Sequence, residues 1–587
     1  MKRTLQIKTL VVLGLVAIST SCKKYLDVNQ NPNDVTAATP DLILPQALTA
    51  TAALSQTFNG ATYGGDLGGY MANAGGVSGF GDFWTFVFNS GDANACWTNT
   101  FDNLQDYQYI LNNTTSTGPL KNFNAVARLM KAFDYLRLVD AYGDVPYTQA
   151  LQGATYLTPA YDKGSDVYKN CITEIDNAIT TFKASSASAT SLATNSNGVI
   201  DVTKYSSVTS NSNVALCGSS GTDMTNWIKF ANTIKLRALI RIQNAAVLSS
   251  FYTTEKATMA SLTSNDFIGA DVLINPGYVQ QSGKQNPLFN AYAWTYTGTN
   301  STKSYIPTTF ITAFYNGTKL TDGTKAAGSN TTPADNGRGN LIYRDYLHSN
   351  QLGFQSTNSS LQPANPTGGE WYVGTNGNGS PTGLAAQGFG VMKGFDQGQP
   401  LITASESLFL QAEGSMNGLL PAVGSTTAAL FNLGIQYSFA YLDKDHNDNI
   451  SSSLYVATNN TPTTQLAKYQ ADNATSYLVN FALATTQAQK LEAIITQKYI
   501  ALNMLNNDEG WNEYRRTLYP VSVPPSNPAS NGSNSFSPSF MTIATPRSDG
   551  LAGRILYPSS EYSYNTANVP SVDVNKTLVF WDARPTN

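Results

Sequence analysis

Apolar residues recur at helical spacing in several long segments of this chain. Within 121–142, Val126, Leu129 and Phe133 follow one another at steps of three and four residues, which places them on one face of a helix. The segment 224–245 repeats this pattern with Trp227 and Ile234. The same spacing predicts further helices over 41–57, 94–112, 165–183 and 425–441.

Two short polar motifs predict where further helices begin. Thr403 is followed three residues later by Glu406, and Thr486 is followed at the same distance by Gln489. This spacing is typical of a capping box, in which the two side chains bind the free backbone amides of the first helical turn. We therefore expect helices to begin directly after Thr403 and Thr486.

The segments between these helices have a different character. They are rich in Gly, Asn, Ser, Thr and Pro, and they lack the sustained alternation of a half-buried strand. Irregular segments of this length inside a compact domain are usually functional loops or insertions. They cover 59–92, 185–222, 263–304, 317–400 and 517–580.

The pattern as a whole predicts a mainly α fold. Paired helices of this length suggest stacked helix–turn–helix units of tetratricopeptide type, although no 34-residue repeat survives in the sequence. We find no linker that would separate independent domains. The expected architecture is a helical-pair scaffold with long irregular loop insertions.

Composition narrows the classes of function. The 587 residues carry 35 Lys and Arg against 39 Asp and Glu, a net charge of −4, with 41% hydrophobic residues. That hydrophobic content is ample for a large core, and the acidic balance disfavours a nucleic-acid partner. The two histidines, His348 and His446, leave little room for chemistry that needs a histidine cluster.

The first residues resemble an export signal. Lys2 and Arg3 precede nine apolar residues at 10–18, a run too short to span a bilayer but typical of a signal peptide. Small residues then lead to Cys22, as in a bacterial lipobox, although Ser19 stands where a leucine is usual. We expect a lipoprotein signal peptide at 1–21, acylated Cys22 with fatty acids such as palmitate, and a lipidated tether at 22–39. The alternative is an ordinary signal peptide with an incidental Cys22.

Three cysteines remain if Cys22 is acylated. Cys96, Cys171 and Cys217 allow at most one disulfide, and none is spaced as C-x-x-C. Buried, inert thiols are the favoured interpretation.

Several motifs, in order along the chain, resemble those of the SusD/RagB family of nutrient-binding outer-membrane lipoproteins. Arg515 and Arg516 within them are expected to pair with a carboxylate such as Glu406 or Glu513. The matching segments are 140–150 (DAYGDVPYTQA), 158–162 (TPAYD), 227–237 (WIKFANTIKLR), 400–414 (PLITASESLFLQAEG), 497–499 (QKY), 509–516 (EGWNEYRR), 554–561 (RILYPSSE) and 581–582 (WD).

This resemblance implies a fold and a function. It implies a SusD-like nutrient-binding domain at 40–587, with variable loops on the ligand face. It also implies a lipid-anchored protein on the surface of the outer membrane, which acts as the lid of a SusC-like TonB-dependent transporter. The family signatures mark the scaffold, so they do not locate the ligand.

Aromatic residues in the irregular segments are the candidates for ligand contact. Neutral sugars need aromatic planes for the apolar faces of their rings, and amides or hydroxyls for their hydroxyl groups. Trp84, Trp294, Tyr296, Trp371 and Tyr372 each lie among Gly or Asn residues that permit unusual backbone conformations. The alternative for each tryptophan is a place in the core. Polar contacts could come from Gln280, Gln281, Lys284 and Asn286.

One acidic segment has the spacing of a calcium loop. Asp443, Asp445 and Asn447 place oxygen ligands at alternate positions. The segment departs from the EF-hand pattern, with Asp448 where glycine is needed and Leu454 where the bidentate glutamate should be. A solvated turn between helices is the favoured interpretation, and no other cofactor is expected.

Three functions are compatible with the sequence. The first is a non-catalytic surface receptor that captures an oligosaccharide, or else a peptide or other nutrient, and delivers it to the transporter. The second is a surface hydrolase, for example a glycosidase that uses an Asp/Glu pair. The third is a purely structural lipoprotein. Nine glutamates, few histidines and no motif that pairs two acids favour the non-catalytic receptor.

Overall fold

The computed structural model describes residues 38–74, 81–185, 192, 201–302, 304–322, 337–343, 349–354, 390–450, 461–523, 534–535 and 547–585. The expected signal peptide and the acylated Cys22 lie outside these ranges. Among the described residues, no helix combines the length and the apolar character needed to cross a bilayer.

Long helices form most of the scaffold, and they occupy the segments that the apolar periodicity predicts. α5 spans Lys121–Tyr142 and α4 spans Asn94–Asn112, both as predicted. The other long helices are α2 (Pro40–Asn59), α6 (Gly164–Lys183), α7 (Thr225–Ile242), α8 (Ser249–Met259), α12 (Ala404–Met416), α13 (Thr427–Leu442), α15 (Pro462–Asp472), α16 (Gln487–Leu502) and α17 (Asn507–Thr517). The mainly α fold with long irregular insertions is confirmed.

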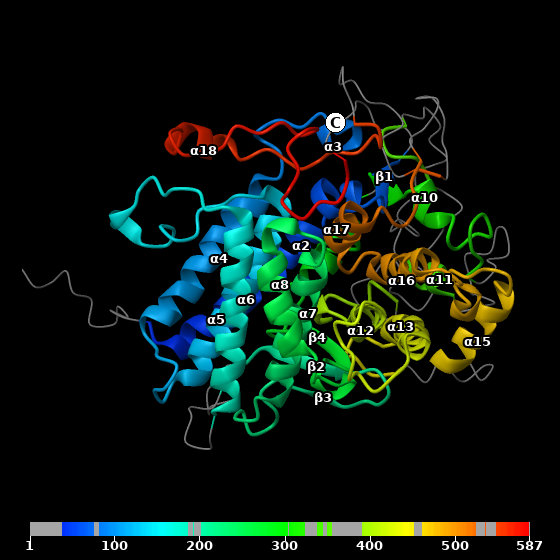
Figure 1. Ribbon diagram of the computed structural model, residues 1–587, viewed down its shortest axis with the longest axis horizontal. Helices are drawn as coiled ribbons and strands as arrows, with labels where there is room; N and C mark the ends of the chain where they lie inside the picture. The colour runs from blue at the N-terminus through cyan, green and yellow to red at the C-terminus, as the bar shows by residue number, and fades with distance from the viewer. Residues whose placement is uncertain are drawn as a thin grey trace, which may run out of the picture.

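Neighbouring helices pack against one another in chain order. Figure 1 shows α4, α5 and α6 on one side of the molecule, α7 and α8 in the middle, and α12, α13 and α16 on the other side. α5 packs between α4 and α6, α7 joins α6 to α12, and α12 pairs with α13 and α16. This succession is the arrangement of helical pairs that the sequence predicts.

A four-stranded antiparallel sheet lies beside the helices, and the sequence did not predict it. Its order is β3 (Asn213–Val214), β2 (Thr203–Ser207), β4 (Ala270–Ile274), β6 (Gln399–Ile402). All residues of β4 and β6 are buried, so neither strand shows alternation of apolar and polar residues. A second pairing joins β1 (Met71–Asn73) to β5 (Tyr305–Pro307).

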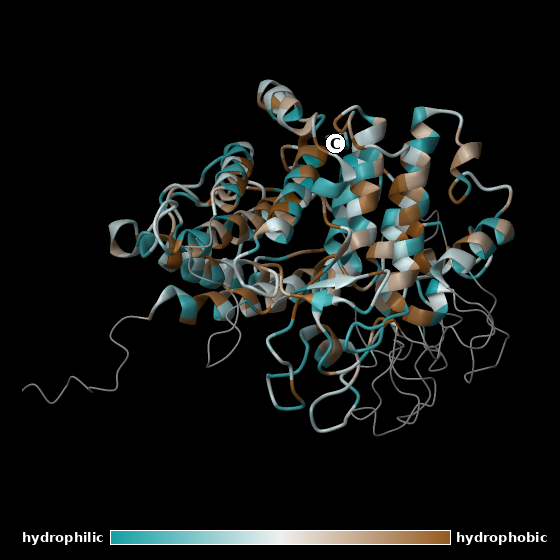
Figure 2. Cartoon of the chain, turned by 90° about the horizontal axis from the view of Figure 1, so that it is seen from below, coloured by the Kyte–Doolittle hydropathy of each residue, from teal (hydrophilic) through white to brown (hydrophobic). Residues whose placement is uncertain are grey.

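One continuous hydrophobic core connects these elements. It extends from Leu44 in α2 to Trp581 near the end of the chain. Hydrophobic and hydrophilic residues alternate around the long helices in Figure 2, as expected for amphipathic helices packed on one side. Within the described ranges, the core gives no sign of a boundary between independent domains.

The two predicted capping motifs have different outcomes. At α16, Thr486 and Gln489 form the complete capping box. At α12, the Thr403 hydroxyl accepts a hydrogen bond from the Glu406 amide, but the Glu406 side chain turns into the core and faces Arg237 at 3.4 Å. The helix begins where expected, while the glutamate serves tertiary packing.

Buried ion pairs fix the family motifs to one another. Arg241 of α7 contacts Asp140 of α5 at 3.3 Å and also pairs with Glu509 of α17. Burial opposes ionisation of Glu509, but Arg241 and Arg237 outweigh this effect and hold the pKa of Glu509 well below its usual range. Burial raises the pKa of Asp140 to about 6 despite Arg241. These charges stabilise the scaffold and face away from solvent.

The expected partners of Arg515 and Arg516 are confirmed only in part. Arg516 pairs with Glu513, as predicted, and also with Glu413 at 2.6 Å. Arg515 donates to the carbonyl oxygen of Asp140 at 2.7 Å and lies over the Trp511 ring. Glu406 pairs with Arg237 instead, since α12 presents it to α7.

The three described cysteines are buried free thiols. Cys96, Cys171 and Cys217 lie in different elements and form no disulfide. Burial raises the pKa of each thiol. The prediction that these thiols are buried is confirmed, and their inertness stays a prediction.

Candidate functional site

A tight turn presents the aromatic segment 293–300. Trp294 and Asn300 form an antiparallel bridge, and the amide of Thr295 donates to the carbonyl oxygen of Thr299 at 2.9 Å. Gly298, with φ of +84°, allows the chain to reverse direction between them. The hydroxyl groups of Thr295 and Thr299 lie 2.7 Å apart and close the base of the turn.

Flanking elements hold this turn in place. The short helix α9 (Pro287–Tyr292) precedes it, and β5 follows it and pairs with β1. Asn286 caps α9 by accepting a hydrogen bond from the Phe289 amide. Asn286 is buried, so the prediction that it contacts a ligand at the surface is wrong.

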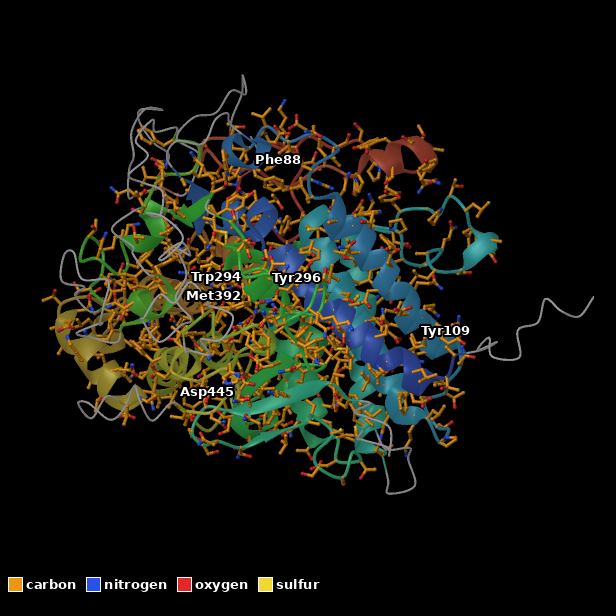
Figure 3. All side chains as sticks on the ribbon, turned by 180° about the vertical axis from the view of Figure 1, so that it is seen from behind. Phe88, Tyr109, Trp294, Tyr296, Met392 and Asp445 are labelled. Atoms are coloured by element: carbon orange, nitrogen blue, oxygen red, sulfur yellow. The ribbon has the colours of Figure 1, made fainter. Side chains whose placement is uncertain are left out.

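The loop 275–286 packs beside the turn. The Gln280 side-chain amide donates to the carbonyl oxygen of Tyr296 at 3.1 Å. Val279, Gln281 and Lys284 of this loop are exposed, and Tyr296 is 44% exposed. We call the exposed side chains of 279–284 and 295–299 the Tyr296 surface. Figure 3 labels Tyr296 and Trp294 near the middle of the view from behind.

Trp294 and Tyr296 differ sharply in exposure although only one residue separates them. Trp294 is only 2% exposed and belongs to the hydrophobic core. The prediction of Trp294 as an open platform for a ligand is therefore corrected, because its ring supports the turn from below. Tyr296 is the predicted aromatic residue that this turn presents to solvent.

Buried polar atoms without partners cluster in the same stretch of chain. They include the indole nitrogen of Trp294, the side-chain oxygen of Asn300 and the hydroxyl of Ser301. Tyr278 and Gln285 in the neighbouring loop also have unpaired polar atoms. Buried polar groups are nearly always hydrogen-bonded, so each of these atoms calls for a partner such as a water molecule or a ligand atom. The sequence reasoning named Trp294 but missed the other four residues, since burial cannot be read from the composition of a loop.

The Tyr296 surface contains no acidic residue. Neither 279–284 nor 295–299 includes Asp or Glu, and Lys284 is the one charged side chain in these two segments. A glycosidase needs two carboxyl groups on either side of the scissile bond. The side chains of these two segments therefore offer hydrogen bonds and an aromatic face, and no carboxyl group.

The other predicted aromatic residues lie elsewhere. Trp84, in the short helix α3 (Asp82–Thr85), is half-buried and packs against the core. Phe88, which contacts Phe83 of the same helix, lies in Figure 3 apart from Trp294 and Tyr296. Trp371 and Tyr372 lie outside the described residues.

The predicted calcium loop is a turn after α13. One carboxylate oxygen of Asp445 accepts hydrogen bonds from the amides of Asn447 and Asn449, each at 2.9 Å. Asp443 is buried and accepts from Gln465, while Asp448 pairs with Lys204. In the described part of the chain, no three His, Cys, Asp or Glu side chains are grouped as metal ligands. Calcium binding by Asp443, Asp445 and Asn447 stays a prediction.

Comparison with solved structures identifies the fold. A SusD homologue from Bacteroides fragilis superposes with a TM-score of 0.58 and 17% identity, covering 93% of this chain and 100% of its own. A SusD homologue from Bacteroides uniformis gives 0.54 and 22%, covering 92% and 99%. A chitin-binding SusD homologue from Flavobacterium johnsoniae gives 0.57 and 18%, covering 92% and 99%. At these identities the likeness concerns the fold.

Comparison of sequences identifies the family. The search of curated proteins finds no match. The profile described as "SusD-like: Susd and RagB outer membrane lipoprotein" matches residues 33–266 and 384–582, which is most of the chain. The matched ranges include the ion-paired motifs of α5, α7, α12 and α17. The chain therefore belongs to the SusD-like family of outer-membrane lipoproteins.

Proposed function

We propose that this protein is a non-catalytic receptor that captures an oligosaccharide at the Tyr296 surface. The observation that carries the proposal is an exposed aromatic ring on a rigid turn, surrounded by amide and hydroxyl groups. The half-exposed Tyr296 ring can cover the apolar face of one sugar. Gln281, Thr297 and Thr299 can exchange hydrogen bonds with its hydroxyl groups.

The charge of this surface favours a neutral ligand. The surface lacks carboxylates, and its one cation, Lys284, is exposed on the loop. An exposed cation contributes little net binding energy in water. Recognition of this kind depends on shape and hydrogen bonds. The chitin-binding relative from Flavobacterium johnsoniae binds such a neutral glycan, which supports the same class of ligand here.

The remainder of the proposal concerns location and partner. We infer that Cys22 carries the lipid that anchors the protein to the outer membrane, as the family description implies. The captured oligosaccharide then passes to a SusC-like TonB-dependent transporter, for which this protein is the lid.

Affinity electrophoresis tests the proposal. The mature protein is run through native gels that contain one polysaccharide each, with chitin oligosaccharides as soluble competitors. Tyr296→Ala should abolish the retardation seen with the natural chain. Tyr156→Ala is the matched control, since Tyr156 is 42% exposed in another loop and should leave retardation unchanged.

The same samples separate the alternatives. Release of reducing ends from any polysaccharide would show a hydrolase and refute the non-catalytic role. Equal loss of retardation in both tyrosine variants would place the ligand elsewhere. Absence of retardation with every glycan, together with heat on titration with peptides, would favour a peptide ligand.

A further inference from the structure

The loop 151–160 and the short helix α18 (Ser559–Tyr564) form a projecting corner of the molecule. Figure 1 shows them side by side at one edge, the loop in cyan and α18 in red. Every residue of 152–158 is exposed, and so are all residues of 563–567 except the buried Asn565. We call the exposed side chains of 152–158 and 563–567 the Leu157 surface.

Large apolar side chains stand on the Leu157 surface. Leu157 and Tyr564 are each 82% exposed, and no other large hydrophobic side chain in the described ranges is as exposed. Tyr156, next to Leu157, is also exposed. Single exposed apolar residues are ordinary on a protein surface, whereas a group of them marks contact with a protein or a membrane.

Hydrogen bonds between the two elements make these side chains one group. The side-chain amide of Asn565 donates to the carbonyl oxygen of Pro159 at 2.9 Å, and a second bond from Asn568 to the loop is 3.0 Å long. Tyr564 directly precedes Asn565, and Leu157 lies two residues before Pro159. The contact therefore brings the two most exposed apolar residues together from opposite ends of the chain.

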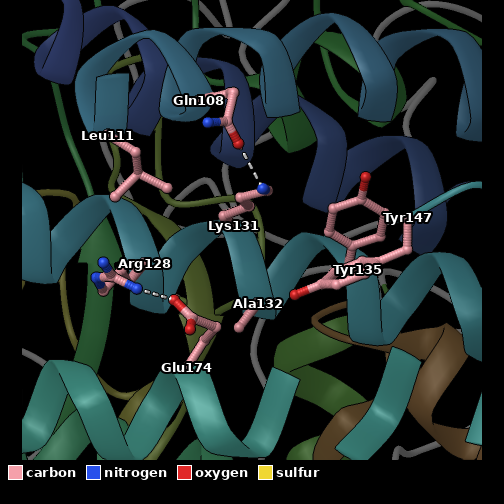
Figure 4. A pocket seen from close by; sticks show the side chains of 8 residues that line it. All are labelled: Gln108, Leu111, Arg128, Lys131, Ala132, Tyr135, Tyr147 and Glu174. Atoms are coloured by element: carbon pink, nitrogen blue, oxygen red, sulfur yellow. Dashed lines mark hydrogen bonds and ion pairs between the residues drawn. The ribbon is translucent and has the colours of Figure 1, made fainter. Parts of the chain in front are cut away.

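The base of the loop is fixed to the helical scaffold. The amides of Tyr147 and Thr148 donate to one carboxylate oxygen of Asp162, each at 2.9 Å. The Tyr147 ring packs edge-on against Tyr135 of α5, with centroids 4.8 Å apart, and lines the cavity of about 300 Å³ between α4, α5 and α6 (Figure 4). The apolar tips are thus presented on an ordered base.

No charged residue belongs to the Leu157 surface. Neither 152–158 (QGATYLT) nor 563–567 (SYNTA) contains Lys, Arg, Asp or Glu. Glu561, two residues before this surface, accepts a hydrogen bond from the Tyr161 hydroxyl at 2.8 Å. A leucine and two tyrosines without charge suit the boundary between hydrocarbon and water, where an apolar ring is buried and its hydroxyl stays wet.

The described chain begins at the same edge of the molecule. The Tyr109 hydroxyl donates to the carbonyl oxygen of Ala38 at 2.8 Å, which holds the start of the described chain beside α4. Figure 3 places Tyr109 on the right-hand side, where α18 and the loop 151–160 also lie. Ala38 follows Cys22 by 16 positions, and a chain of this length spans at most about 55 Å. The lipid proposed on Cys22 is therefore tied to this edge.

We propose that the Leu157 surface inserts into the interfacial region of the membrane that holds the lipid on Cys22. This inference rests on the lipid anchor of the proposed function. Burial of Leu157 and Tyr564 at the boundary of headgroups and acyl chains supplies the binding free energy. A lipid on a tether limits the distance from the bilayer, and a second point of contact sets the orientation of the domain.

A protein partner does not match this surface as well. A stable protein interface buries about 800 Å² on each side and surrounds an apolar centre with a polar rim. Three large apolar side chains on a projecting corner provide a smaller, convex contact. Insertion into lipid needs no complementary surface, so a corner of this kind is sufficient for it.

Fluorescence at position 157 tests the proposal. The mature chain with Cys22→Ala carries no lipid, and its other cysteines are buried, so a dye reacts with a thiol added at the surface. Leu157→Cys in this background, labelled with a nitrobenzoxadiazole dye, should show blue-shifted and severalfold stronger emission with phosphatidylcholine vesicles. The matched control is Leu483→Cys, because Leu483 is 45% exposed in η7 (Phe481–Leu483), which contacts α13 on the other side of the molecule. Its emission should not change.

Vesicle flotation of the same unlipidated chain measures the contribution of each side chain. Leu157→Ser and Tyr564→Ser should each lower the partition coefficient about tenfold, because each removes a large apolar group from the contact. Both residues are exposed, so the fold should be unaffected. Leu483→Ser should leave partitioning unchanged. Adding phosphatidylglycerol should not strengthen binding, since the surface has no cation.

Defined outcomes would overturn the proposal. An unchanged emission at position 157 would exclude insertion, and binding that requires phosphatidylglycerol and survives Leu157→Ser would place the membrane contact elsewhere. Dimers in sedimentation equilibrium, or co-purification with the transporter, that Leu157→Ser abolishes without any vesicle binding would assign the surface to a protein partner. These assays contain neither glycan nor lipidated cysteine, so their failure is distinct from a failure of glycan capture or of the anchor.

Discussion

Replacing Trp294 and Tyr296 separately by alanine distinguishes support of the turn from contact with the ligand. Trp294 is buried beneath the turn and Tyr296 stands on it. Trp294→Ala should therefore destabilise the fold, whereas Tyr296→Ala should act on glycan binding alone. The two substitutions lie two residues apart, so each is a control for the other.

The expected magnitudes follow from burial. Removing a buried tryptophan side chain costs about 3–5 kcal/mol of unfolding free energy, while an exposed substitution usually changes it by less than about 0.5 kcal/mol. Unfolding entropy of about 2.1 cal/mol/K per residue gives about 1.2 kcal/mol/K for 587 residues. Trp294→Ala should thus lower Tm by about 2–4 °C, and Tyr296→Ala by less than about 1 °C.

Differential scanning calorimetry and affinity electrophoresis on the same preparations provide the two measurements. Tyr296→Ala should combine an unchanged Tm with lost retardation. Trp294→Ala should combine a lowered Tm with weakened retardation, because the turn loses its base. An unchanged Tm in Trp294→Ala, with retardation lost, would show that this ring faces the ligand and would refute the reasoning from burial.

Three further predictions concern the scaffold and the anchor. Arg241→Met should lower the free energy of unfolding by about 3–5 kcal/mol in calorimetry, because it leaves several buried carboxylates without their shared cation. The control Lys163→Met removes an exposed ion pair and should lower it by less than about 1 kcal/mol. Equal losses in the two variants would contradict the importance of the buried network. Burial raises the pKa of Asp134 to about 7, so this group favours folding when protonated and loses that contribution as pH rises from about 4 to 7. The difference in Tm between Asp134→Asn and the natural chain should therefore favour the variant more at pH 8 than at pH 5, by the equivalent of a few kcal/mol. The same difference in Tm at both pH values would be inconsistent with a carboxyl group that is protonated in the folded state. Cys22→Ala, expressed without the transporter, should move the exported protein from the membrane fraction to the soluble fraction in immunoblots; retention in the membrane would argue against the lipid anchor.

Local sequence patterns predicted most of the helical scaffold. The three- and four-residue spacing of apolar side chains located α4 and α5 at their observed bounds, and the Thr486 motif located the start of α16. These features depend on residues within one or two helical turns, so they are readable from one chain. The strands escaped this reasoning, because β4 is buried on both faces and shows no alternation.

The roles of the charged motif residues required the tertiary structure. Glu406 occupies the position of a capping residue, yet it pairs with Arg237, which is 169 residues away in the chain. A buried carboxylate has a large desolvation cost, which a paired cation offsets. The backbone amide at the start of the helix can instead be bound by another group. The sequence identified these residues as conspicuous, but their partners depend on how α7, α12 and α17 pack.

The sequence by itself determined the helical scaffold, the family resemblance and the aromatic segment that contains the candidate surface. Only the tertiary structure decided that Trp294 is buried while Tyr296 is exposed, since a tight turn directs nearby side chains to opposite sides. It also brought Gln108, Lys131 and Glu174 from three helices around one cavity. Periodicity is a local property, whereas exposure and cavities arise from contacts between distant segments, and this difference sets what one chain can reveal.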